Sequence, residues 1–129
     1  MTNLPLVSII TPSFNQAQFL EETIQSVLGQ DYPQIEYIIV DGGSTDGSVD
    51  MIKKHAGRLA WWVSEQDQGQ TDAINKGFNR AKGEILAWIN SDDTYNPGAV
   101  GEAVKYLLEN PGFAMVYADC NFINAEGQV

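Results

Sequence analysis

Short apolar runs alternate with amphipathic segments along the chain, and this alternation most constrains the fold. We expect the apolar runs to be strands, at residues 6–10, 37–40, 59–63, 85–89 and 113–117. The segments between them, such as residues 20–28, have apolar side chains at helical spacing. This repeated order predicts an α/β fold with an open, mostly parallel, twisted sheet and helices on both faces.

Individual side chains refine this prediction. Asn15 and Asp46 precede amphipathic segments, and each can cap a helix because its side-chain oxygen accepts hydrogen bonds from free backbone N–H groups. Trp61, Trp62 and Trp88 lie inside apolar runs. We therefore expect the three tryptophans in the core.

Composition limits the classes of function. Of 129 residues, 17 are acidic and 7 basic, giving a net charge of -10; this argues against a nucleic-acid-binding module, which presents a basic surface. The length predicts one domain.

The single cysteine, Cys120, excludes an internal disulfide and a cysteine-rich zinc site, and we expect it to be buried. The apolar runs are too short to cross a bilayer and the first residues are polar, so we expect an intracellular protein without a signal peptide.

The end of the sequence differs from the rest. After the fifth apolar run, residues 120–129 contain no further segment with helical periodicity. We therefore expect a truncated fold, in which this chain is the N-terminal part of something longer.

Polar side chains gather immediately after the predicted strands. Residues 11–15 follow the first run, Asp41 the second, residues 64–69 the third and residues 91–93 the fourth. Three of these four segments carry carboxylates, whereas the apolar runs carry none. Ligands of open α/β sheets bind beyond the carboxyl ends of the strands. The distribution therefore predicts a ligand site at that edge.

The adjacent pair Asp92 and Asp93 has the most chemical content. Two neighbouring carboxylates repel each other, and a divalent cation relieves that repulsion. Mg²⁺ is typically held by one or two carboxylates together with substrate phosphates. The pair could instead cap the segment that follows, because Asp is common at helix starts. The residues alone leave both interpretations open.

Three further charged residues have a functional and a structural interpretation. Asp41 ends a buried strand, where its carboxylate could bind a ribose hydroxyl or a base N–H; the alternative is a turn. Asp67 could likewise be a turn residue. Lys76, one of seven basic residues, could contact a phosphate or a base, or be a solvated helix position.

Several common motifs are absent from the sequence. No Gly-x-Gly-x-x-Gly follows the first run, which argues against a dinucleotide-binding Rossmann domain, and no Gly-x-x-x-x-Gly-Lys-Ser/Thr loop occurs. A Gly-x-Ser-x-Gly motif is also missing, and one histidine leaves little for a hydrolase triad. Receiver-type signalling domains carry an acidic pair after the first strand, where this chain has Thr11 and Pro12.

Five segments together resemble family 2 glycosyltransferases with the GT-A fold. They are residues 8–15 (SIITPSFN), 37–47 (YIIVDGGSTDG), 75–77 (NKG), 81–84 (AKGE) and 91–93 (SDD). They occur in the family's order and cover nearly the whole chain, which looks most like transferases that build bacterial surface polysaccharides. The resemblance implies that residues 1–129 are the nucleotide-sugar-binding part of a glycosyltransferase domain, without its acceptor-binding part.

The resemblance also implies roles for single residues. Positions that bind the nucleotide are matched by Thr11, Pro12, Asp41, Asp67, Lys76 and Asp92. Asp93 matches the position that binds the Mn²⁺ or Mg²⁺ bridging the donor diphosphate. The family's catalytic base is a carboxylate in the C-terminal half, so we expect it beyond Val129.

The implied activity is a metal-dependent, inverting transfer. The donor would be a nucleoside-diphosphate sugar, with a UDP-sugar favoured, and the acceptor a saccharide or a lipid-linked molecule in polysaccharide biosynthesis. Such a protein would be cytoplasmic, and the full-length form would associate peripherally with the inner face of a membrane. The alternative is a non-catalytic module that binds nucleotide sugars.

Overall fold

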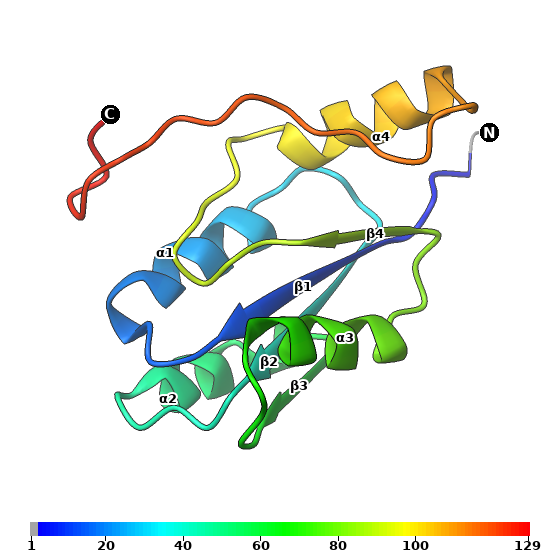
Figure 1. Cartoon of the computed structure of the whole chain (residues 1–129). Helices are drawn as coiled ribbons and strands as arrows, with labels where there is room; N and C mark the ends of the chain where they lie inside the picture. Colours follow the sequence, from blue (N-terminus) through cyan, green and yellow to red (C-terminus); the bar gives the residue numbers. More distant parts are fainter. Residues whose placement is uncertain (1–2) are drawn as a thin grey trace.

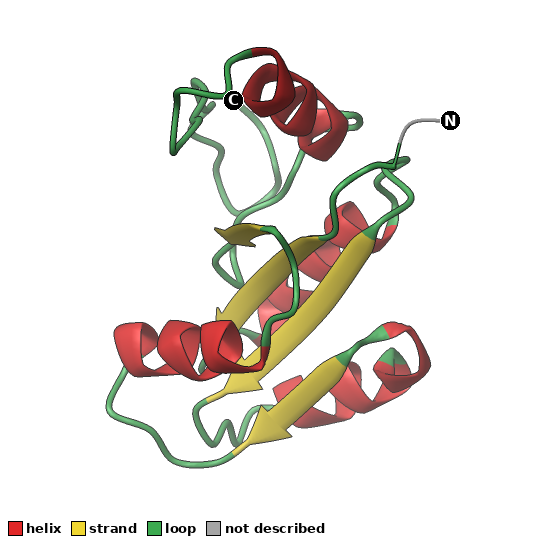
Figure 2. Cartoon of the chain, turned by 90° about the vertical axis from the view of Figure 1, so that its right-hand side faces the viewer, coloured by secondary structure: helices red, strands yellow, loops and turns green. Residues whose placement is uncertain are grey.

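The computed structural model describes residues 3–129 and contains a four-stranded parallel sheet with helices on both faces (Figures 1 and 2). The elements in chain order are β1 (Val7–Ser13), α1 (Ala17–Leu28), β2 (Ile35–Asp41), α2 (Ser48–Lys54), the 3-10 helix η1 (Ala56–Arg58), β3 (Trp61–Ser64), α3 (Gln70–Arg80), β4 (Ile85–Trp88) and α4 (Ala99–Glu109). The predicted α/β class and the first four predicted strands are confirmed.

The strand order is β3-β2-β1-β4, so β1 has a neighbour on each side. The pairing of β1 with β2 runs from Val7↔Ile35 to Ser13↔Asp41, and β3 continues the row through Asp41↔Ser64. Because all the pairs are parallel, the carboxyl ends of the strands meet at one edge. The residues that follow the strands are thereby brought together from distant parts of the sequence.

Alternation along the strands builds a core on each face of the sheet. On one face Ile9 and Ile39 pack with residues of α1, α2 and α4. On the opposite face Ile10 and Ile38 pack against α3, with Ala73 in their cluster. β1 and β2 are buried from both sides, which explains why residues 37–40 of β2 are continuously apolar.

Gly77 allows α3 to lie very close to β1. A Cβ at this position would lie 2.6 Å from both Cγ1 and Cγ2 of Ile10, which is itself fully buried. No side chain larger than hydrogen fits there unless the helix moves away from the strand.

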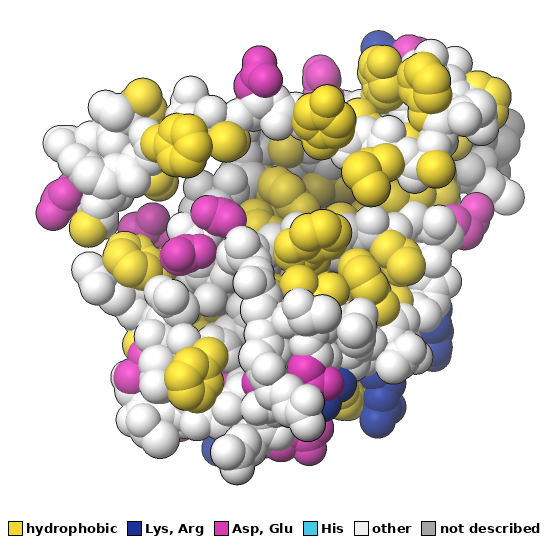
Figure 3. Space-filling model, viewed as in Figure 1, with side chains coloured by type: hydrophobic (Ala, Val, Ile, Leu, Met, Phe, Trp, Pro, Cys, Tyr) yellow, Lys and Arg dark blue, Asp and Glu magenta, His cyan; other side chains and the backbone are white. Residues whose placement is uncertain are grey.

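The expected fifth strand, residues 113–117, is wrong. These residues form no strand, and Figure 1 shows them passing α4 apart from the sheet. The Phe113 ring stacks on Tyr106 of α4 with ring centroids 6.3 Å apart, while Met115 and Tyr117 are exposed. An apolar run becomes a strand only where a neighbour pairs with its backbone, and none does so here. Figure 3 shows apolar side chains gathered on this part of the surface.

Three single-residue expectations are also wrong. Trp88 is 54% exposed because α3 packs over β1 and β2 and leaves that face of the edge strand β4 open. Cys120 is exposed, since the segment around it joins no core. Asn15 does not cap α1: Gln16 holds the cap position, and the Asn15 side chain instead accepts a hydrogen bond from the N–H of Thr45 at 2.9 Å.

Within residues 3–129, none of the helices has the length and apolar character that crossing a membrane requires.

We predict that Gly77→Ala lowers the free energy of unfolding by about 1–3 kcal/mol, because the added methyl group overpacks the contact with Ile10. Gly101→Ala is the matched control. Gly101 also lies inside a helix, but its Cβ would meet only Asp31 Oδ1, at 4.0 Å; stability should therefore be unchanged or slightly higher. Urea unfolding followed by circular dichroism measures both variants. Equal stability of Gly77→Ala and the wild type would contradict this close packing.

Candidate functional site

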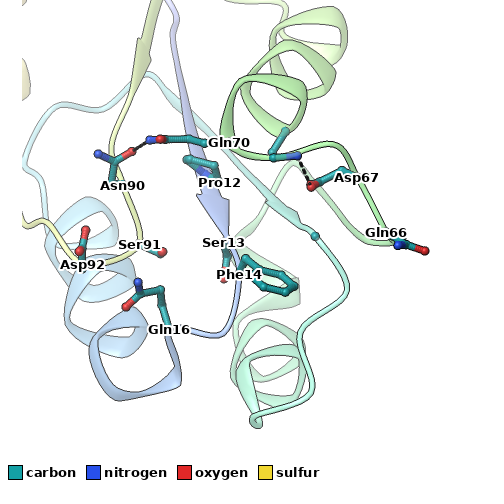
Figure 4. Close-up of a pocket in the computed structure, with 13 residues that line it drawn as sticks. Pro12, Ser13, Phe14, Gln16, Gln66, Asp67, Gln70, Asn90, Ser91 and Asp92 are labelled. Atoms are coloured by element: carbon teal, nitrogen blue, oxygen red, sulfur yellow. Dashed lines mark hydrogen bonds between the residues drawn. The ribbon is translucent and has the colours of Figure 1, made fainter.

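A cavity of about 510 Å³ lies at the carboxyl-terminal edge of the sheet (Figure 4). Its walls come from the end of β1 with the loop into α1, from Gly42 after β2, from the β3–α3 loop with the start of α3, and from the loop after β4. The volume is within the range usual for small-molecule sites. The position is the edge at which the sequence predicted a ligand site.

The structure divides the predicted site residues into two groups. Pro12, Asp67 and Asp92 line the cavity; Pro12 comes from the end of β1, and the two aspartates come from two separate loops. Those not among its lining residues are Thr11, Asp41, Lys76 and Asp93. The contacts of each residue explain the division.

Asp41 is fully buried, and its carboxylate shapes the loop after β2. Oδ2 accepts hydrogen bonds from the N–H groups of Gly43 (3.0 Å) and Ser44 (2.8 Å) and from Ser64 Oγ (2.8 Å), and Oδ1 accepts one from Ser44 Oγ (2.6 Å). Four donors therefore surround this carboxylate. It connects the turn after β2 to the end of β3. Asp41 itself does not line the cavity, but the next residue, Gly42, does.

Thr11 is also fully buried, one strand position before the cavity wall. Its hydroxyl is hydrogen-bonded to the phenol of Tyr37 on β2, with an oxygen–oxygen distance of 2.8 Å. Burial raises the pKa of Tyr37, so the phenol keeps its proton at physiological pH. The pair fixes β1 to β2 just below the site.

Asp67 is both a turn residue and a cavity residue. Its Oδ1 accepts a hydrogen bond from the N–H of Gly69 at 2.9 Å, as the structural interpretation predicted. The same carboxylate lies against Gly42, where a Cβ would be 2.9 Å from Oδ1. Gly42 is thus the residue that lets the β3–α3 loop close onto the loop after β2.

Lys76 points to acidic neighbours on its own side of α3. Its Nζ lies 3.2 Å from Glu65 Oε1 and 3.6 Å from Asp72 Oδ2. Partial burial lowers the pKa of Lys76, but the hydrogen bond to Glu65 and the nearby acidic charges outweigh it, and the net shift is upward. The ammonium group therefore remains charged and compensates part of the negative charge beside the site.

Asp92 and Asp93 are exposed in the loop after β4. They do not cap a helix, because α4 begins only at Ala99 and Gly98 holds its cap position. The backbone of Asp93 is fixed by two bonds: its N–H donates to Asn90 O (3.1 Å) and its carbonyl accepts from Thr23 Oγ1 (2.6 Å). Asn90 Nδ2 also donates to Asp93 Oδ2 at 3.4 Å. The helix-cap alternative for the pair is thereby removed.

Amide side chains that sequence reasoning did not select form much of the cavity lining. Gln16, Gln66, Gln70 and Asn90 all line it, and the exposed ring of Phe14 stands among them. Gln70 Nε2 donates a hydrogen bond to Asn90 Oδ1, which joins the start of α3 to the loop after β4 above Pro12 (Figure 4). Their signal in the sequence was only their position just beyond strand ends.

The donor set fits a cation that is shared with a ligand. Among residues 3–129, no three His, Cys, Asp or Glu side chains gather closely enough to hold a metal by themselves. Two adjacent exposed carboxylates, one of them on the cavity wall, match the arrangement in which Mg²⁺ or Mn²⁺ takes its other ligands from substrate phosphates and water.

Asp46 connects the starts of two helices beside the site. Its Oδ1 accepts from both the N–H (3.1 Å) and the hydroxyl (2.6 Å) of Ser48, the first residue of α2. Its Oδ2 accepts from the N–H of Ala17, the first residue of α1, at 2.9 Å. Asp46 therefore has the expected capping role, although it lies one position before Gly47, the cap residue of α2. It binds the first residues of both α1 and α2.

Comparisons with known proteins bear on this site. The family model described as glycosyl transferase family 2 matches residues 8–127. The Bacillus subtilis protein named putative teichuronic acid biosynthesis glycosyltransferase TuaG is 38% identical over 113 residues, which cover 84% of this chain and 45% of that protein.

Solved structures share the fold. The mannosyltransferase PcManGT of Pyrobaculum calidifontis, in complex with GDP-Man and Mn²⁺, matches with a TM-score of 0.75 and 32% identity, over 82% of this chain and 33% of that one. S. aureus TarS in complex with UDP-GlcNAc gives a TM-score of 0.75 and 25% identity, over 82% and 32% of the two chains. This chain thus spans less than half the length of each of these proteins.

We predict a pH-dependent loss of stability in Asp46→Asn. The hydroxyl of Ser48 and the N–H of Ala17 lower the pKa of Asp46 below its ordinary 3.8, so the ionised carboxylate stabilises the folded state above that pH. At neutral pH the variant should be about 1 kcal/mol less stable, as for a lost helix cap. The difference should shrink as the pH falls below 3.8, because the wild-type carboxylate then takes up its proton. Urea unfolding at a series of pH values measures it, and a difference that does not change with pH would contradict the assignment.

Proposed function

Because this chain belongs to glycosyl transferase family 2, we propose that it binds a nucleoside-diphosphate sugar in the cavity beyond its strand ends. The observation that carries the proposal is the convergence of Pro12 at the end of β1 with Asp67 and Asp92 from two loops on one cavity. The solved structures that hold GDP-Man and UDP-GlcNAc support this class of donor. We favour a UDP-sugar.

The proposal for the whole protein is transfer of the donor's sugar, with inversion, to a saccharide or lipid-linked acceptor. Residues 1–129 would be the donor-binding part, and the acceptor-binding part and the catalytic base would belong to sequence beyond Val129. The relative named for teichuronic acid biosynthesis supports a role in building polysaccharides. A protein with such a role would act in the cytoplasm, at the inner face of a membrane.

The nucleoside would occupy the part of the cavity between Phe14 and Asp67. Side-chain amides can both donate and accept hydrogen bonds, so Gln66 and Gln70 could pair with the polar edge of a base or with ribose hydroxyls. The exposed Phe14 ring offers an apolar face to the planar base. Pro12 would complete the wall behind the nucleoside.

The residues outside the lining would support the same site. Asp41 holds the loop in which Gly42 lines the cavity, and Thr11 fixes the strand beneath it. Lys76 would reduce the repulsion between a diphosphate and the acidic residues Glu65 and Asp72.

Asp93 would hold a Mn²⁺ or Mg²⁺ ion, with Asp92 beside it facing the ribose or the sugar. Once bound, the metal would neutralise negative charge on the departing nucleoside diphosphate. Asn90 would orient the Asp93 carboxylate through its amide. The net charge of -10 makes a cation valuable for binding any diphosphate, and the Mn²⁺ in the solved mannosyltransferase complex supports this assignment.

We predict that the chain binds UDP or GDP only when Mn²⁺ or Mg²⁺ is present. Asp93→Asn should weaken this binding about tenfold or more, or by about 1.4 kcal/mol or more, since the neutral amide loses the attraction between the carboxylate and the metal. Isothermal titration calorimetry with each nucleotide, with and without the metal, gives the dissociation constants.

Asp50→Asn is the control for the change in net charge. Asp50 is exposed in the first turn of α2 and does not line the cavity. Its replacement should leave the dissociation constant unchanged. Binding that is independent of metal, or weakened equally by both variants, would refute the metal assignment.

A further inference from the structure

Ser13 lies on the wall of the cavity with an unusual hydrogen-bonding state. It is the last residue of β1, it is 4% exposed, and it lines the cavity between Phe14 and Ser91 (Figure 4). Its carbonyl accepts a hydrogen bond from the N–H of Gly42 at 2.8 Å. Its hydroxyl, in contrast, is the one buried side-chain polar atom among residues 3–129 that has no partner.

The fold pairs comparable hydroxyls elsewhere. Ser8, on the same strand and fully buried, donates to Glu36 Oε1 at 2.7 Å and accepts from the N–H of Gly83 at 2.8 Å. Thr11, between them in the strand, is bonded to Tyr37. Buried polar groups are nearly always paired, because an unpaired one loses its bonds to water without replacement. The free hydroxyl of Ser13 is thus an exception at the cavity and not a general feature of β1.

The neighbours of Ser13 in sequence cannot supply the missing partner. The side chains of Pro12 and Phe14 have no hydrogen-bonding group, and Asp41, the register partner of Ser13, already receives four hydrogen bonds. A hydroxyl both donates and accepts, so an oxygen atom of a molecule in the cavity would satisfy it.

We infer that Ser13 Oγ donates a hydrogen bond to a ribose or phosphate oxygen of the nucleoside diphosphate held in the cavity. The inference rests on the proposed function and adds a binding residue that sequence reasoning did not select. The hydroxyl has almost no solvent-exposed surface in the free protein, so the short Ser13 side chain would turn toward the cavity when the ligand binds. Ser13 therefore favours binding and disfavours the stability of the free protein.

The test compares Ser13→Ala with the wild type by two measurements. The dissociation constant for UDP and for GDP, with Mn²⁺, should rise about threefold to tenfold for whichever nucleotide the wild type binds, as expected for one lost neutral hydrogen bond. The melting temperature of the free protein should stay the same or rise by a few degrees, because the variant removes an unpaired buried polar atom.

Ser8→Ala is the matched control, since it removes a buried hydroxyl of the same strand that is paired and does not line the cavity. It should lower the melting temperature and leave the dissociation constant unchanged. The inference is overturned if Ser13→Ala binds as tightly as the wild type, or if it loses as much thermal stability as Ser8→Ala. If the wild type binds neither nucleotide, the proposed function fails as well; if only the variant comparison fails, the proposed function stands without Ser13.

Discussion

The parallel pairing of β1 with both β2 and β4 is the constraint on which the rest of the structure depends. Together with the parallel pairing of β2 with β3, it places Ser13, Asp41 and Ser64 in one row at the carboxyl edge and directs every following loop to the same side. The close contact of Gly77 with Ile10 then sets the distance of α3 from the sheet. The cavity follows from these packing relations, because its walls are the loops that parallel strands must place there.

The acidic residues of this chain have different roles although they are chemically alike. The carboxylates of Asp41 and Asp46 accept hydrogen bonds from backbone N–H and hydroxyl groups. These bonds hold the loops and helix starts beside the cavity. Asp67 shapes a turn and also forms part of the wall. Asp92 reaches the cavity from an exposed loop. Of these four aspartates, two have purely structural roles, and only Asp67 and Asp92 line the cavity.

Much of the sheet and the location of the site could be predicted from the sequence, because apolar runs fix the strands and parallel topology fixes the ligand edge. The fifth run at residues 113–117 could not, since its pattern says nothing about whether a neighbouring strand is present to pair with it. The exposure of Trp88 could not be predicted, because it depends on which strands α3 covers. The helix packs over β1 and β2 and leaves that face of β4 open. Ser13 was predicted only to lie near the ligand edge, as one of residues 11–15; the lack of a hydrogen-bond partner for its hydroxyl is visible only in the packed structure.

The most direct test of the central claim, that the cavity at the strand ends holds a nucleoside diphosphate, is a map of amide chemical shifts during titration with UDP or GDP in the presence of Mg²⁺. The account predicts that the largest changes fall on residues 13–16, 66–70 and 90–92, which line the cavity. Changes centred on the apolar groove beneath α4, lined by Leu4, Tyr32 and Val104, with none at the strand ends, would contradict it.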